Sequence, residues 1–187
     1  MNEKNLVTVL GIDPGTNHCG YCLMKGIPGQ LNSLVIVDIG VYSPKAKTYI
    51  EKLKLLHEFF KNYLRTYQPD RVILETVFLG KNVQSMLKLG RLQGMLFGLC
   101  IDQNIPILMH SPREIKQAIT GKGGASKQQV AFMIKQIFEI KTTLKLDATD
   151  AAATSLSYFL NQQQLKVKTH PSGWEKFIQE NKDRILQ

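Results

Sequence analysis

Apolar residues form three short runs in the first 42 residues, separated by stretches rich in Gly, Pro and Asn. The runs cover residues 6–12, 20–24 and 33–42. Runs of this length bounded by turn-forming residues predict β-strands. Because the connections between them are short, we expect the three strands to pair as an antiparallel meander.

After residue 46 the apolar pattern changes to helical spacing. Residues 47–67 carry apolar side chains three and four positions apart, and the Gln-Pro-Asp that follows ends this helix. A short apolar strand at 71–74, a second helix at 82–100 and a fifth strand at 105–110 come next. This alternation of strands and helices predicts an α/β fold.

The C-terminal part of the pattern predicts further helices. Ser111 is a candidate cap for a third helix, and Ser126 with Gln129 forms a capping box for a fourth. A last helix begins near Asp147 and runs to Leu160. The chain is therefore predicted to form a five-stranded mixed sheet flanked by helices, with the first and fourth strands parallel at its centre.

Length and composition agree with a single domain. A chain of 187 residues, 43% of them hydrophobic, fits one globular unit. We expect the domain to span residues 1–165 and a tail to follow at 166–187, as a peripheral helix or a partly mobile segment. The odd cysteine count favours reduced thiols, and no stretch resembles a signal peptide or a membrane span. These features predict a cytoplasmic protein with no membrane partner.

Positive charge is concentrated in two parts of the chain. The formal net charge is +9, which favours polyanionic partners. Residues 76–100 contain three basic residues and no acid, and residues 111–145 contain seven basic residues and two acids. Both stretches follow the acidic positions described next, as in an anion-binding surface around an acidic centre. An ordinary solvated basic face explains the charge equally well.

Four acidic residues occupy positions that suit a shared site. Asp13 and Glu75 each follow an apolar strand, so parallel pairing of those strands brings both carboxylates to one edge of the sheet. Asp147 and Asp150 are three residues apart and share a face at the start of the last helix. Each also has a structural explanation: Asp13 as a turn former before Pro-Gly, Glu75 as an exposed strand end, and Asp147 as a helix cap.

Carboxylates that lie close together repel one another unless they are protonated or bind a cation. Oxygen ligands without thiol or imidazole partners favour Mg²⁺, with Mn²⁺ as a substitute. Two such ions about 4 Å apart would stabilise the attacking and leaving oxygens of a phosphodiester. The residues therefore predict metal-dependent phosphodiester hydrolysis with one or two ions per subunit.

The order of these acids resembles the ribonuclease H-like fold and, more closely, the RuvC family of Holliday-junction resolvases. The resemblance rests on "GIDPGT" at the first acid, "ETVFLGKNVQSMLKLGRLQG" at the second, "SPREIKQAITGKGGASKQQV" before the last helix and "DATDAAA" at its start. It covers roughly residues 7–160. It implies an endonuclease that resolves four-way DNA junctions in recombination and repair, by paired symmetric nicks.

The resemblance also implies roles for individual residues. The family's divalent-metal site is matched by Asp13, Glu75, Asp147 and Asp150. Lys116 and Lys127 match two lysines that serve catalysis and DNA contact, and Phe78 matches an aromatic residue facing the junction. With the basic stretches, the DNA-binding candidates are Phe78, Lys81, Lys88, Arg91, Arg113, Lys116, Lys122 and Lys127. The family further implies a homodimer and a complex with a branch-migration helicase.

Three other functions compete with this prediction. "GIDPGT" also resembles the first phosphate loop of the actin and sugar-kinase fold, but 187 residues leave no room for the duplicated domain that such proteins need. A binding module that has lost catalysis would be expected to lack an acid, whereas all four are present. A ribonuclease H-like nuclease for another substrate, such as an RNA–DNA hybrid, is equally consistent with the composition.

Overall fold

The structure is a computed structural model that describes residues 5–76 and 82–167. The elements along the chain are β1 (Val7–Asp13), β2 (Cys19–Ile27), β3 (Gln30–Tyr42), α1 (Tyr49–Tyr67), β4 (Arg71–Glu75), α2 (Val83–Asp102), β5 (Ile107–His110), α3 (Pro112–Thr120), α4 (Lys127–Ile137) and α5 (Leu146–Val167). All the strands and helices predicted between residues 6 and 160 are present. Over the described ranges, no helix combines the length and apolar character needed to cross a bilayer.

The sheet has the predicted mixed topology. Its strand order is β3-β2-β1-β4-β5. β1 pairs antiparallel with β2, β2 antiparallel with β3, and β4 lies parallel to both β1 and β5. β1 is therefore the central strand, and its carboxyl end lies beside the carboxyl end of β4.

The hairpin between β2 and β3 makes both strands longer than the sequence predicts. β2 extends to Ile27 and β3 begins at Gln30, where these two residues pair. The turn between them includes Gly29 at φ 86°, a left-handed conformation that glycine adopts without steric cost. Hydrogen bonding between the two strands continues beyond their apolar runs. The apolar pattern of either strand alone does not reveal this extension.

Helix starts follow local sequence closely. The side chains of Ser111 and Ser126 accept hydrogen bonds from the third backbone N–H of α3 and α4, and both helices have complete capping boxes. These two predictions are confirmed. α5 begins at Leu146, so Asp147 lies within its first turn. The same helix continues to Val167, past the predicted domain boundary at residue 165, whereas residues 168–187 lie outside the described part of the chain.

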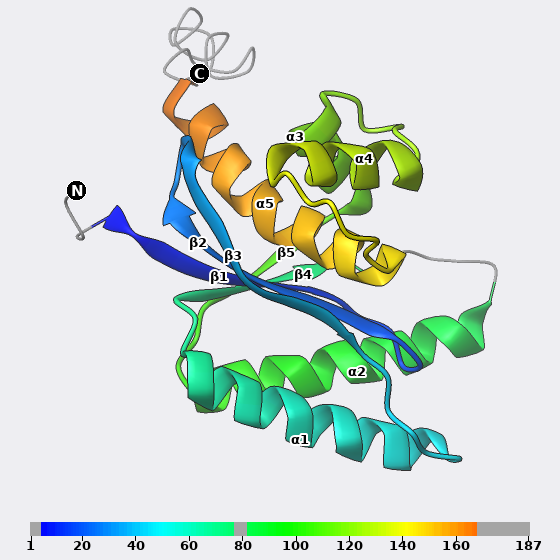
Figure 1. The fold of residues 1–187 in the computed structure, drawn as a ribbon. Coiled ribbons are helices and arrows are strands. Elements are labelled where there is room, and N and C mark those ends of the chain that lie inside the picture. Colours follow the sequence, from blue (N-terminus) through cyan, green and yellow to red (C-terminus); the bar gives the residue numbers. More distant parts are fainter. Residues whose placement is uncertain (1–4, 77–81, 168–187) are drawn as a thin grey trace, which may run out of the picture.

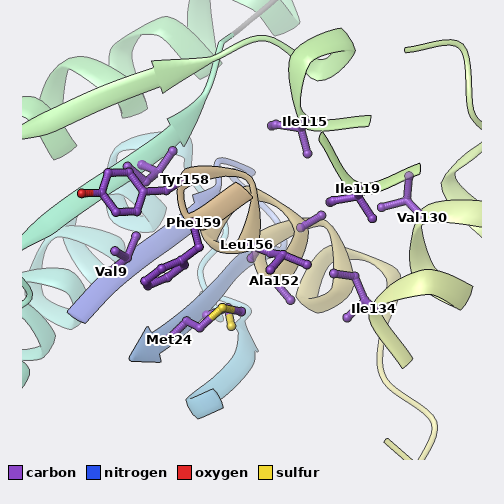
Figure 2. Close-up of a cluster of buried hydrophobic side chains, with 14 of the residues drawn as sticks. Val9, Met24, Ile115, Ile119, Val130, Ile134, Ala152, Leu156, Tyr158 and Phe159 are labelled. Carbon is purple, nitrogen blue, oxygen red and sulfur yellow. The ribbon is translucent and has the colours of Figure 1, made fainter. Parts of the chain in front are cut away.

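Helices cover both faces of the sheet (Figure 1). α1 and α2 pack on one face, and α3, α4 and α5 lie on the other. Neighbouring residues of β1 alternate between the two cores: Val9 joins the α5 side and Leu10 the α1–α2 side. Figure 2 shows the α5 side, where Phe159 lies beside Val9 and Met24 of the sheet, and the side chains of α3 and α4 lie on the opposite side of α5. α5 is thus enclosed on both sides, which fixes the position of its first turn.

Candidate active site

The two parallel strands bring two acidic residues to one edge of the sheet. Ile12 pairs with Leu74 in the β1–β4 ladder, and Asp13 and Glu75 follow them as the last residues of the two strands. Parallel strands carry both side chains out at the same edge. The predicted juxtaposition of Asp13 and Glu75 is therefore present.

Neighbouring elements hold the end of β4. The Gln93 side chain, buried on α2, donates a hydrogen bond from Nε2 to the Glu75 carbonyl oxygen at 2.7 Å. The Thr76 N–H donates to the His110 carbonyl oxygen at 2.9 Å. Because both α2 and β5 hydrogen-bond to this backbone, the main chain that carries the Glu75 carboxylate is held in place.

A glycine on β2 brings the first turn of α5 to the same edge. Gly20 pairs with Asp13 across the β1–β2 ladder. A Cβ atom added at Gly20 would lie 2.0 Å from the Asp147 carbonyl oxygen and 3.3 Å from the Ala151 Cβ. Any other residue at position 20 would push the helix away, so glycine lets α5 present Asp147 and Asp150 beside Asp13.

The electrostatics of Asp13 show how closely the acids interact. Burial raises its pKa to about 7, and the negative charges of Glu75, Asp150 and Asp147 contribute in the same direction. Lys127 acts against this rise. A buried carboxyl with several acidic neighbours is stabilised either by a proton or by a nearby cation.

Glu75 has the same kind of environment. Burial raises its pKa, and the charge of Asp150 adds to that effect. Two ammonium groups, those of Lys127 and Lys116, oppose it. Both predicted lysines therefore lie close enough to the acids to act on them electrostatically.

An ion pair connects α4 to α5 at this site. Lys127 Nζ donates a hydrogen bond to Asp150 Oδ2 at 2.5 Å. The Asp150 side chain is 12% exposed and the Lys127 side chain 61%. A cavity of about 100 Å³ lies beside the pair, and its lining residues are Glu75, Pro112, Ile115, Lys116, Lys127, Val130, Asp150 and Ala153. The cavity thus joins acidic and basic side chains from β4, α3, α4 and α5.

Donor chemistry at this edge suits a hard divalent cation. The oxygens of Asp13, Glu75 and Asp150 are partly desolvated and repel one another, which is the condition that a bound cation relieves. In the arrangement of the described side chains, no three Asp, Glu, His or Cys residues stand close enough together to hold a metal ion. Metal binding therefore requires these carboxylates to draw closer.

The remaining predicted DNA-contact residues lie on several elements. Arg113 and Lys122 are exposed at the start of α3 and in the α3–α4 loop. Lys88 and Arg91 are exposed on α2 near Tyr49, with Lys88 Nζ 6.0 Å from the Tyr49 ring centroid. Neither α2 residue lines the cavity. Phe78 and Lys81 lie outside the described residues.

Sequence reasoning missed several residues that support the site. Gly20 and Gln93 belong to this group, since each acts on the backbone of another element. The run of small residues after Asp150 is typical of a helix that packs closely on a sheet. No local pattern identified the strand residues that it would meet.

Comparisons of the sequence with a family model and with known proteins indicate the same family. The family model described as "Crossover junction endodeoxyribonuclease RuvC" matches residues 9–158. A protein of that description from Cytophaga hutchinsonii is 40% identical over 179 residues, covering 95% of this chain and 87% of the relative. Its counterpart from Christiangramia forsetii is 38% identical over 178 residues, covering 95% and 92%.

A solved structure is similar over most of the fold. It is Thermus thermophilus RuvC in complex with Holliday junction substrate, with a TM-score of 0.76 and 25% sequence identity. The match covers 84% of this chain and 96% of that one. The family-model match at residues 9–158 includes all four acidic positions, 13, 75, 147 and 150.

Proposed function

The chain belongs to the RuvC family of crossover junction endodeoxyribonucleases, and we propose that it resolves four-way DNA junctions by paired symmetric nicks. Its fold is the ribonuclease H-like arrangement of a five-stranded mixed sheet between helices. The observation that carries the proposal is the group of mutually repelling carboxylates from β1, β4 and α5, with two lysines beside it. Such a group suits metal-dependent cleavage of a phosphodiester.

The proposed metal is Mg²⁺, for which Mn²⁺ would substitute. Asp13, Glu75, Asp147 and Asp150 would hold it. When bound, the metal supplies the charge that activates water and stabilises the phosphate in the transition state. The pKa of Asp13 in the metal-free protein is raised to about 7, so metal binding at or below that pH would displace a proton from this carboxyl.

The two lysines have separate tasks in this proposal. Lys127 neutralises Asp150 in the metal-free protein, and its exposure leaves it accessible to a DNA phosphate. Lys116 lines the same cavity and acts on Glu75 through its charge. Ammonium groups beside the scissile phosphate offset the negative charge that grows there in the transition state.

Basic residues around the site would bind the DNA backbone. Arg113 and Lys122 are exposed near Lys116 and Lys127 in the sequence, and Lys88 and Arg91 would reach a neighbouring arm. Phe78 and Lys81, outside the described residues, are proposed from the sequence alone. Contacts of this kind bind phosphate groups and carry little base specificity, which suits recognition of DNA by its shape.

Paired nicks require two copies of the site, so we propose a homodimer. α2 offers a surface for a second copy. Its outward face exposes Val83, Leu87 and Ile101, and a Cβ atom added at Gly90 or Gly94 would have no neighbour within 4 Å. This surface is hereafter called the α2 face. A cytoplasmic branch-migration helicase is the further proposed partner.

A cleavage assay tests the proposal. A labelled four-way junction is incubated with the full chain in Mg²⁺ or in EDTA, with linear duplex and RNA–DNA hybrid as controls. We expect symmetric nicks in the junction, in Mg²⁺ only. Asp13→Asn should abolish cutting and keep junction binding, whereas the matched variant Asp102→Asn, exposed at the end of α2, should cut normally.

Two other results would contradict the proposed substrate or activity. Junction binding without cutting by the parent protein would indicate a binding module. Faster cutting of the hybrid than of the junction would keep the metal chemistry and replace the substrate.

A further inference from the structure

A buried serine on α5 connects the helix to the two strands that lead to Asp13. The Ser155 hydroxyl accepts a hydrogen bond from the Gly11 N–H at 2.7 Å and donates one to the Cys22 carbonyl oxygen at 2.7 Å. Gly11 and Cys22 pair across the β1–β2 ladder. One side chain therefore joins the backbones of both strands, and its exposed fraction is 0%.

At Gly11, the backbone of β1 and the backbone of α5 are in direct contact. A Cβ atom added at Gly11 would lie 2.4 Å from Ser155 Oγ, 2.5 Å from Ser155 N and 2.6 Å from the Ala151 carbonyl oxygen. The helix backbone thus rests directly on β1. Among the α5 side chains at positions 146–161, no other hydrogen-bonds to β1 or β2.

The contact lies close to the acids on both β1 and α5. Gly11 is two residues before Asp13 on β1, and Ser155 is five residues after Asp150 on α5. Near the acidic edge the helix touches β2 again, where the Asp147 carbonyl oxygen faces Gly20. The Gly20 contact is steric and limits how near the helix can come, whereas the Ser155 hydrogen bonds hold it in register along the strands.

We propose that Ser155 is a positioning residue that sets the register between α5 and β1, and through it the approach of Asp150 and Asp147 to Asp13. The inference rests on the proposed metal site. The acids have to draw closer to bind a cation, and they come from elements that are far apart in the sequence. A shift of α5 along the sheet would change their separation directly.

A second serine on the same helix supplies a matched control. Ser157 is also 0% exposed, and its hydroxyl bonds to His110 Nδ1 and to the Thr154 carbonyl oxygen, each at 2.7 Å. Its contacts reach β5, not the strand pair that ends at Asp13. Ser157→Ala therefore removes a buried hydroxyl without releasing the β1–β2 contact.

The test is Mn²⁺ binding to the full chain without DNA, measured by the electron paramagnetic resonance signal of free Mn²⁺. We expect Ser155→Ala to raise the dissociation constant roughly tenfold, the lower end of the usual effect of losing a residue that orients metal ligands. Ser157→Ala should bind as the parent does. Thermal unfolding in EDTA measures the loss of stability in both variants.

Equal Mn²⁺ binding by the two serine variants, whether weakened or normal, would overturn the positioning role. If Ser155→Ala does not fold, Ser155→Cys keeps the side-chain volume with a weaker hydrogen-bonding group, and weaker Mn²⁺ binding than that of Ser157→Ala supports the role. If the unmutated protein binds Mn²⁺ but cuts no junction, the proposed function is refuted. The comparison of Mn²⁺ binding by Ser155→Ala and Ser157→Ala would still test the positioning role. A parent that binds no Mn²⁺ would refute both.

Discussion

At the scale of single residues, the site is a balance between burial and opposing charges. Asp13 and Glu75 are partly buried beside further acids, and each has a raised pKa. Lys127 offsets part of this charge through its ion pair with Asp150. The metal-free arrangement is therefore electrostatically costly, and a bound cation would relieve that cost.

This cost predicts how stability depends on pH in the metal-free protein. The pKa of Asp13 is about 7 in the folded protein and 3.8 for an ordinary Asp carboxyl, so between these pH values the native state binds more protons than the unfolded state. Stability then falls as pH rises from about 4 to about 7. Asp13→Asn removes the effect, and in EDTA we expect it to stabilise the protein at pH 8 but not at pH 4.

Urea unfolding at both pH values measures the difference. An upper bound is about 4 kcal/mol, from 1.36 kcal/mol per pKa unit. Asp102→Asn serves as the exposed control and should change stability equally at the two pH values. A stability gain from Asp13→Asn that is the same at pH 4 and pH 8 would refute the raised pKa.

At the scale of elements, the site depends on how closely one helix approaches the sheet. α5 is enclosed between the sheet and α3–α4 (Figure 1), and glycines at positions 11 and 20 let its backbone touch β1 and β2. Ala148, Ala151 and Ala152 are buried along the helix. Small residues on the helix and on the strands therefore set the distance between the sheet and the first turn of α5, where two of the acids lie.

Gly20→Ala tests this packing. The added methyl group would collide with the Asp147 carbonyl oxygen, which lies 2.0 Å from the position of the new atom, so the first turn of α5 has to move. We expect a loss of about 1–3 kcal/mol in unfolding free energy and at least a tenfold slower cleavage of the junction, because misplacement by about 1 Å is costly in catalysis.

Gly124→Ala is the matched control for that experiment. A Cβ atom added at Gly124 would have no neighbour within 4 Å, so stability should change by less than about 0.5 kcal/mol. Chemical denaturation and a cleavage time course measure both quantities. Normal cleavage by Gly20→Ala would show that the position of α5 does not limit the reaction.

At the scale of the whole molecule, the two helical layers have different roles. The α3–α5 layer supplies acids and lysines to the site. In the α1–α2 layer, Gln93 supports Glu75, while the α2 face exposes apolar and small residues. A dimer formed through this face would place two sites in one particle, as paired cutting requires.

Leu87→Glu tests the dimer. Leu87 is 46% exposed on the α2 face, so a charge there should leave the fold intact and disfavour burial against a second copy. We expect a monomer by sedimentation velocity and nicks that are no longer paired. Val35→Glu, 60% exposed on the edge strand β3, should remain dimeric and cut normally. A dimeric Leu87→Glu variant would exclude the α2 face as the interface.

The sequence by itself determined the elements and the candidate acids. Strands, helix starts and the positions of Asp13 and Glu75 at strand ends depend on residues close together in the chain, so local patterns were enough to predict them. Ser111 and Ser126 show this most directly, because each cap bonds to backbone only three residues away.

Tertiary structure decided which of these residues meet and how closely. Lys127 pairs with Asp150 across 23 residues, and Ser155 binds Gly11 across 144. Both contacts depend on the packing of α4 and α5 over the sheet, which is a sum of many weak interactions between distant segments. No local pattern contains that sum, so only the tertiary structure reveals that Gly11 and Gly20 are the strand residues against which α5 packs.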